Sequence, residues 1–163
     1  MIQLKIKNLN QVISSIENYK KEIEEKTNRF VKALAESGVQ IATLKILEND
    51  AIFTGELSES MEMRPGDTFT NGSQWIVFTG CRWAKYVEFG TGIIGARSQH
   101  YDATIQGWEY DINHHGEDGW WYQRDDEPGK WRWTKGMPSR PFMYETALEL
   151  YDLIQEKARE VFG

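Results

Sequence analysis

Three closely spaced glycines are the first residues that could do chemistry. The segment FGTGIIGA (89–96) has glycine at 90, 92 and 95, which matches the letter pattern of loops that cradle a dinucleotide phosphate. Such a loop must open a helix inside a β–α–β unit, and the residues that follow, ARSQHYDATIQGW (96–108), have no helical apolar stripe. We therefore predict a turn that needs positive φ at the end of a strand, and no bound cofactor.

The histidines and the single cysteine do not predict a metal site. Apart from His100, the histidines are His114 and His115, and neighbouring side chains on an extended chain point in opposite directions. Cys81 is the only cysteine, so the chain has neither an internal disulfide nor a cysteine metal site. We interpret His114 and His115 as the polar tip of a hairpin.

Carboxylates among tryptophans are the remaining candidates for catalysis. A sugar site has this composition, and glycosidases use a pair of carboxylates. The acids concerned are Glu109, Asp111, Glu117 and Asp118. Most of the other acids alternate with lysine on helix faces, and no G-x-S-x-G elbow supports a serine nucleophile. We expect no catalytic residue.

Composition limits the possible partners. The 163 residues carry a formal net charge of −6, and no segment is a basic patch, so tight binding along a nucleic acid backbone is not expected. No segment approaches the roughly 20 apolar residues of a membrane span. The first ten residues, MIQLKIKNLN, lack the long apolar run of a signal peptide.

Two predicted helices are expected to form the scaffold that positions any functional side chains. Val12, Ile16, Tyr19 and Ile23 begin an apolar stripe, which predicts one helix over 9–49, or two with a break near 26–28. Gly38 lies inside it and favours close packing or a bend. A second stripe predicts a final helix that ends before Gly163. Pro141 would occupy its first turn, with Ser139 or Arg140 as the cap.

The middle of the chain predicts strands. Residues 2–6 alternate as a short strand, and QWIVFTG (74–80) and AKYVEFG (84–90) are expected to pair as a hairpin. Three aromatic runs at 107–112, 119–124 and 130–136 then predict a β-meander inserted at about 95–136. The whole chain, 1–163, is expected to form one α+β domain. A small antiparallel sheet would be packed by the N-terminal and C-terminal helices.

The tryptophans of the insert have two interpretations. The run GWWYQRDDEPGKWRW (119–133) resembles one aromatic repeat of choline-binding cell-wall modules, which favours a cell-wall or carbohydrate-binding module. Those modules stack several repeats, and this chain has one. Alternatively, the aromatic side chains close a small hairpin or cover a subunit interface. The candidate interface aromatics are Trp108, Trp120, Trp121, Trp131 and Trp133.

Three stretches taken together resemble a known family. They are TGELSESM (54–61), AKYVEFGTG (84–92) and GMPSRPFMYETA (136–147). In this order they are similar to the tail-component family of long-tailed phages and prophages, the small proteins that complete the tail or join it to the head. The matching residues are Tyr86, Val87, Glu88, Phe89, Gly90 and Thr91 in one motif and Pro138, Arg140, Pro141 and Phe142 in the other.

The resemblance implies a virion structural protein without catalysis, made in the host cytoplasm and located in the neck or tail. It implies a homo-oligomeric ring, sixfold, at the head-proximal end of the tail. The neighbours would be the tail terminator and the head–tail adaptor, and DNA would pass through the lumen without specific binding. An acidic lumen would let DNA slide through by repulsion.

Arg140 and Glu88 belong to the two different motifs. On a strand, Tyr86 and Glu88 share one face while Val87 and Phe89 share the other. Arg140 then either pairs with Glu88, which would hold the last helix to the sheet, or caps the helix or lies solvated.

Overall fold

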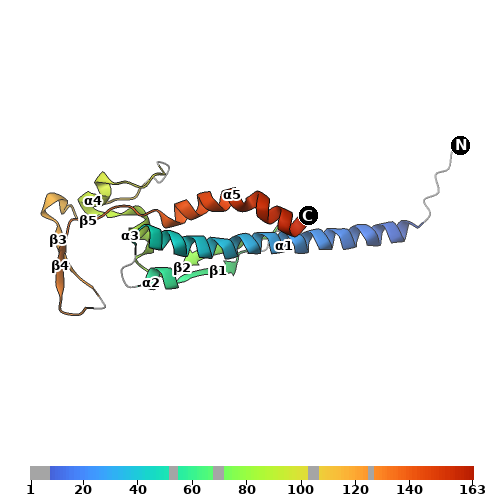
Figure 1. Ribbon diagram of the computed structural model, residues 1–163, viewed down its shortest axis with the longest axis horizontal. Helices are drawn as coiled ribbons and strands as arrows, with labels where there is room; N and C mark the ends of the chain where they lie inside the picture. The colour runs from blue at the N-terminus through green and yellow to red at the C-terminus, as the bar shows by residue number, and fades with distance from the viewer. Residues whose placement is uncertain (1–7, 52–54, 68–71, 103–106, 125–126) are drawn as a thin grey trace.

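The computed structural model describes residues 8–51, 55–67, 72–102, 107–124 and 127–163. The expected strand at 2–6 lies outside these residues. The fold is α+β, as predicted, and elongated (Figure 1). Five helices are present in the described part of the chain: α1 (Leu9–Glu48), α2 (Glu56–Glu59), α3 (Ala84–Phe89), α4 (Gly92–Arg97) and α5 (Phe142–Phe162). The strands are β1 (Met61–Pro65), β2 (Trp75–Thr79), β3 (Trp120–Gln123), β4 (Trp131–Thr134) and β5 (Gly136–Met137), with a 3₁₀ turn, η1, at Gly116–Asp118.

The long helix α1 is continuous over 40 residues, without a break near 26–28. Its C-terminal half packs along α5 and along the β1–β2 sheet, and its N-terminal half projects past the end of α5 (Figure 1). Gly38 permits the close approach, because a Cβ there would lie 3.1 Å from both Leu150 and Val77. The expectation of close packing at Gly38 is confirmed.

The core lies where α1, α2, β1, α3 and the start of α5 meet. Its centre is formed by Ile46 and Phe142, which are almost fully buried. The remaining members of the cluster are Ala42, Ala51, Leu57, Met61, Cys81 and Val87. The first turn of α5 and the segment 84–90 are therefore packed against the same core.

The pairing of the strands differs from the sequence-based prediction. β2 pairs in antiparallel fashion with β1, in the register Met61↔Thr79 and Pro65↔Trp75. It does not form a hairpin with residues 84–90, because those residues are the helix α3. Six residues are too few for periodicity to decide between the two structures. Val87 and Glu88 are adjacent and both buried, which suits a helix packed into a corner and not a two-sided strand.

The insert consists of a β-hairpin that is preceded by turns. β3 pairs with β4, with Trp121 opposite Trp133, as two of the three aromatic runs predicted. The first run, 107–112, forms turns, so the expected meander is wrong at that run. The helix α4, which the sequence did not predict, follows Thr91, and β5 bridges back to it through Thr91↔Met137 and Gly92↔Gly136. The hairpin and the N-terminal half of α1 lie at opposite ends of the molecule (Figure 1).

In the part of the chain that the structure describes, none of the helices is long and apolar enough to cross a membrane.

Candidate functional site: the junction of the two motif segments

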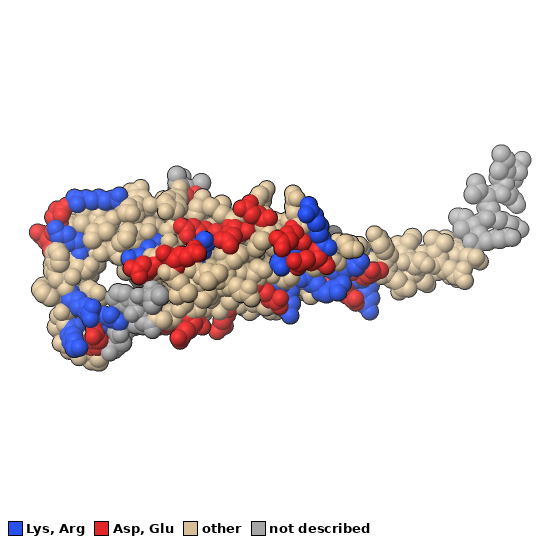
Figure 2. Space-filling view, viewed as in Figure 1, with Lys and Arg blue, Asp and Glu red and all other residues tan. Residues whose placement is uncertain are grey.

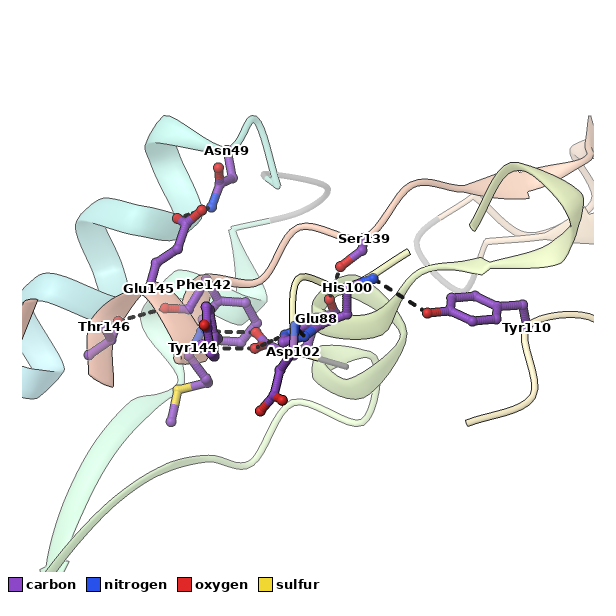
Figure 3. A network of polar contacts seen from close by, with 11 residues as sticks. Asn49, Glu88, His100, Asp102, Tyr110, Ser139, Phe142, Tyr144, Glu145 and Thr146 are labelled. Atoms are coloured by element: carbon purple, nitrogen blue, oxygen red, sulfur yellow. Dashed lines mark hydrogen bonds and ion pairs between the residues drawn. The ribbon is translucent and has the colours of Figure 1, made fainter. Parts of the chain in front are cut away.

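Glu88 is a buried carboxylate at the meeting point of the two motif segments. It lies on α3 and is 7% exposed. Its Oε2 accepts a hydrogen bond from the Met143 backbone N–H at 2.8 Å, and its Oε1 accepts one from the Tyr144 N–H at 3.0 Å (Figure 3). The side chain of one motif thus binds the first turn of the helix that the other motif opens.

The first turn of α5 needs this acceptor. A helix leaves its first N–H groups unpaired, and the N-cap side chain usually accepts from the second or third of them. Here the N-cap residue is Pro141, which has no side-chain oxygen, and Met143 and Tyr144 are the second and third helical residues. Glu88, 55 residues earlier in the chain, supplies the missing cap, and its negative charge lies at the positive end of the helix dipole.

His100 completes the surroundings of the carboxylate. Its Nε2 lies 3.1 Å from Glu88 Oε1, and its Nδ1 accepts a hydrogen bond from the Asp102 backbone N–H at 3.1 Å. An Nδ1 that accepts carries no proton, so the arrangement assigns a neutral imidazole that donates from Nε2 to Glu88. The ring also packs edge-on against Tyr144, with centroids 5.2 Å apart.

Backbone contacts join the same two segments. Ser139 Oγ donates to the Glu88 carbonyl at 2.6 Å, and the Arg140 N–H donates to the Val87 carbonyl at 2.9 Å. Gly90 allows this approach: its φ is 81°, and a Cβ there would lie 2.7 Å from the Ser139 nitrogen. Only glycine fits such a position without displacing the backbone.

The ion pair between Arg140 and Glu88, one of the sequence-based alternatives for Arg140, is not formed. Among the described residues, the side chain that contacts the Glu88 carboxylate is His100, as a hydrogen-bond donor, and both carboxylate oxygens accept hydrogen bonds from the α5 backbone. Arg140 contributes through its backbone, and Ser139 bonds to the Glu88 carbonyl, so neither side chain caps α5. Of the motif residues, Val87 and Phe142 lie in the core.

Two N–H groups of the glycine loop donate to carbonyl oxygens elsewhere in the chain. The Gly92 N–H donates to the Tyr110 carbonyl and the Ile94 N–H donates to the Lys135 carbonyl. Gly90 and Gly92 have positive φ, as predicted. A short helix does follow Gly92, contrary to the prediction, but it stands outside any β–α–β unit in the described fold. The N–H groups of Gly92 and Ile94, which a phosphate could use, are therefore paired internally.

The tryptophans of the insert divide into two groups. Trp108 is half-buried beneath α3, where its Nε1 donates to the Gly90 carbonyl at 3.1 Å and its ring lies 5.0 Å from Phe89. Trp120 stacks on His115. The exposed group is Trp121, Trp131 and Trp133. Trp121 and Trp133 are cross-strand neighbours, and Trp131 lies two residues from Trp133, so the three share one face of the hairpin.

Two of the candidate acids of the insert, Asp111 and Glu117, bind backbone amides and basic side chains, respectively. The amides of Gly116 (2.7 Å) and His115 (3.0 Å) donate to Asp111. The bond from Gly116 is the largest influence and, with the weaker one from His115, holds the pKa of Asp111 below its usual value, although partial burial acts in the opposite direction. Lys135 and then Arg97 lower the pKa of Glu117. His114 and His115 lie in the turn before η1 and not at the expected hairpin tip. No group of three or more metal-binding side chains occurs among the described residues.

Sequence reasoning missed the roles of His100, Ser139 and Tyr144, and it gave Glu88 the wrong partner. The prediction that Pro141 lies in the first turn, with Ser139 or Arg140 as the cap, is wrong, because α5 begins at Phe142 and Pro141 is its N-cap. Pro141 has no side-chain acceptor, so one had to come from elsewhere in the fold.

Comparison of the chain with family models, with curated proteins and with solved structures gives no match.

Proposed function

We propose that the chain is a structural subunit of a bacteriophage neck or head-proximal tail, which completes the tail or joins it to the head. It assembles as a ring, sixfold, and has no catalytic role. The observation that carries the proposal is the junction at Glu88: the segments YVEFGT (86–91) and PSRPF (138–142), on which the resemblance to phage tail components rests, bind each other.

The chemistry of the junction favours a structural role. A carboxylate that acts as an acid, base or nucleophile must reach a substrate. The Glu88 carboxylate is buried and accepts from two α5 amides and from His100. These hydrogen bonds hold α5 against α3, which is a structural role.

The surfaces at the two ends favour assembly. Large exposed apolar side chains that gather in one area mark interaction sites. One such area is the hairpin face with Trp121, Trp131 and Trp133, and another is the projecting half of α1. An elongated subunit with contact surfaces at both ends (Figure 1) suits a position between a tail terminator and a head–tail adaptor.

The charge distribution agrees with a lumen that DNA crosses without binding. Acidic side chains gather over α5 and the neighbouring part of α1 on the face seen in Figure 2. The acids of α5 are Glu145, Glu149, Asp152, Glu156 and Glu160. If this face lines the lumen, it repels the DNA backbone. A neutral or basic lumen in the assembled ring would contradict this part of the proposal.

The test is direct imaging of the assembled state. The full chain, alone and together with neighbouring neck proteins from the same genome, is examined by native mass spectrometry and negative-stain electron microscopy. We expect closed rings of six copies. A chain that stays outside every ring, both alone and with its neighbours, would refute the proposal.

A cell-wall or carbohydrate-binding module is the second candidate, and the exposed tryptophan face of the hairpin favours it. Aromatic faces that are open to solvent can stack on sugar rings or surround the choline cation. This candidate predicts saturable quenching of tryptophan fluorescence by choline or by cell-wall glycan, with no ring. The absence of quenching would exclude it.

A further inference from the structure

The apolar stripe of α1 continues beyond the end of α5. Phe30 meets Phe162 at the last turn of α5, with ring centroids 5.9 Å apart. At intervals of seven residues, Phe30 is preceded by Ile23, Ile16 and Leu9, which lie on the same face of the helix. The projecting half of α1 thus extends the surface on which α5 packs, but nothing in the described chain covers it. Its exposed apolar side chains are Leu9, Val12, Ile13, Ile16, Tyr19 and Ile23.

The spacing of this stripe suits packing along a second helix. Leu9, Val12, Ile16, Tyr19 and Ile23 alternate steps of three and four, which is the a/d pattern of helices that pack side by side. The same face of α1 packs along α5 at Phe30, so a helix on the stripe would continue that contact. We call residues 9–26 the α1 tip.

The charge of the tip permits pairing with itself. Residues 8–16 contain no charged side chain, and the end of the projecting helix is uncharged in Figure 2. Like charges placed opposite one another would oppose the association of identical surfaces. Here the apolar part of the tip has none, so a second copy can approach it without that penalty.

We propose that the α1 tip packs in antiparallel fashion against the α1 tip of a second copy. Ile16 then lies against Tyr19 of the second copy and Val12 against its Ile23, in two symmetric sets. Leu9 lies against the aliphatic stem of Lys26, whose amine is turned to Glu22 at 3.0 Å.

The antiparallel direction follows from where α5 lies. In a parallel pair, the second helix would continue along α1 past Phe30, into the space that α5 occupies. A parallel pair would also place Lys26 opposite Lys26. In the antiparallel pair the second tip stops short of the C-terminal end of α5 at Phe162, and the body of each copy lies beyond the N-terminus of the other copy's α1.

The area is sufficient for a specific, weak contact. Half-exposed side chains of this size each offer on the order of 80 Å² of apolar surface. Six of them on each of two copies would bury about 1,000 Å² in total, near the lower limit for a biological interface. Interfaces of this size are typical of weak, transient contacts, so association is measured in the micromolar range.

This inference goes beyond the proposed function and does not depend on it. An antiparallel pair is a two-fold contact that closes with two copies, whereas a ring is closed by head-to-tail contacts through other surfaces. The free chain can therefore pair through the tip whether or not it forms rings with phage proteins, and each result can fail separately.

The first test measures association of the free full-length chain by sedimentation over about 1 to 200 µM. We compare the wild type with Ile16→Asp and with Asn18→Asp, a control that adds the same charge to the opposite, exposed face of the tip. We expect pairing of the wild type and the control, and at least a ~10-fold weaker association of Ile16→Asp. Ile16 is exposed and far from the core, so helicity should not change. A monomeric wild type, or equal association of all three chains, overturns the proposal.

The second test determines the direction by disulfide formation under mild oxidation. A mixture of Leu9→Cys and Lys26→Cys chains should cross-link, whereas Leu9→Cys alone should not. In the antiparallel pair the two Leu9 positions are 17 residues of helix apart, about 25 Å. The wild type controls for Cys81, which is buried. Efficient cross-linking of Leu9→Cys with itself overturns the antiparallel arrangement.

Discussion

Two carboxylates in this molecule accept hydrogen bonds from two backbone amides each, and they do so in opposite settings. Glu88 is buried and reaches across 55 residues to the start of α5. Asp111 is half-buried and binds the amides of His115 and Gly116, four and five residues ahead. The chemistry is the same, but one bond set joins two parts of the fold and the other closes a turn.

The comparison indicates that separation along the chain decides whether such a hydrogen-bond set stabilises one turn or the whole fold. A local turn forms at little cost in chain entropy, and it can open without the rest of the molecule. The Glu88 cap exists only when α3 and α5 are both in place, so it contributes to the cooperative stability of the whole fold. We therefore expect that removal of the Glu88 side chain destabilises the whole fold, whereas removal of the Asp111 side chain opens only its own turn.

Replacement of Glu88 should have the largest effect. Glu88→Ala leaves two half-buried α5 amides without an acceptor, which should lower the free energy of unfolding by about 2–4 kcal/mol. Glu88→Gln should lose nearly as much, since its single oxygen cannot replace two. The measurement is urea unfolding followed by circular dichroism.

Glu149→Ala is the matched control for Glu88. This acid forms an ion pair with Lys45 at 3.2 Å, but its side chain is 47% exposed, so we expect a loss below about 0.5 kcal/mol. Equal, small losses for Glu88→Ala and Glu149→Ala would show that the cap does not stabilise α5.

Two glycines have similar φ values but different surroundings. Gly90 at the junction has φ 81°, and a Cβ there would meet Ser139 and Met137 backbone within 3 Å. Gly129 in the hairpin loop has φ 85° with nothing within 4 Å. Gly129→Ala should cost about 1 kcal/mol for positive φ alone. Gly90→Ala should cost about 3 kcal/mol, because its backbone (φ 81°, ψ 169°) lies in a region that is almost restricted to glycine and because the junction must open. Matching losses in urea unfolding would contradict the close approach as a source of stability.

The fold was predictable where the signal is long and local. α1 begins at Leu9 and ends at Glu48, within a residue of the prediction, because its apolar stripe persists over many turns. The β3–β4 hairpin likewise follows from alternating aromatic residues on either side of a turn. The α+β class follows from these elements.

The junction was only partly predictable, since its contacts join residues far apart in sequence. Pairing of Glu88 with Arg140, which would hold the last helix, was one of the two sequence-based alternatives, and the structure instead joins Glu88 to the α5 backbone. Its partners could not be identified while residues 84–90 were taken as a strand, because a strand turns Glu88 and Val87 to opposite faces. In the short helix both are buried, and tertiary packing overrides the β-propensity of Tyr86, Val87 and Phe89.

The smallest effect should come from Asp111, and it should depend on pH. The bonds from Gly116 and His115 hold the pKa of Asp111 below its usual 3.8 in the folded protein, so the folded state favours the ionised form. The contribution to stability is then complete above the unfolded pKa and is lost as the pH falls through the lower folded value. Acidification in that range should speed hydrogen exchange at Gly116 and His115 while α5 stays protected.

Carboxyl titration and amide exchange by NMR measure both parts of this prediction. In Asp111→Asn the two amides should exchange faster at neutral pH, and the acid-dependent step should disappear after correction for intrinsic exchange. Glu88→Gln should instead speed exchange throughout α5, because its bonds hold the fold together. If Asp111→Asn also exposed α5 amides, the turn would be coupled to the fold as tightly as the junction, and the separation of the two carboxylates into local and global roles would be wrong.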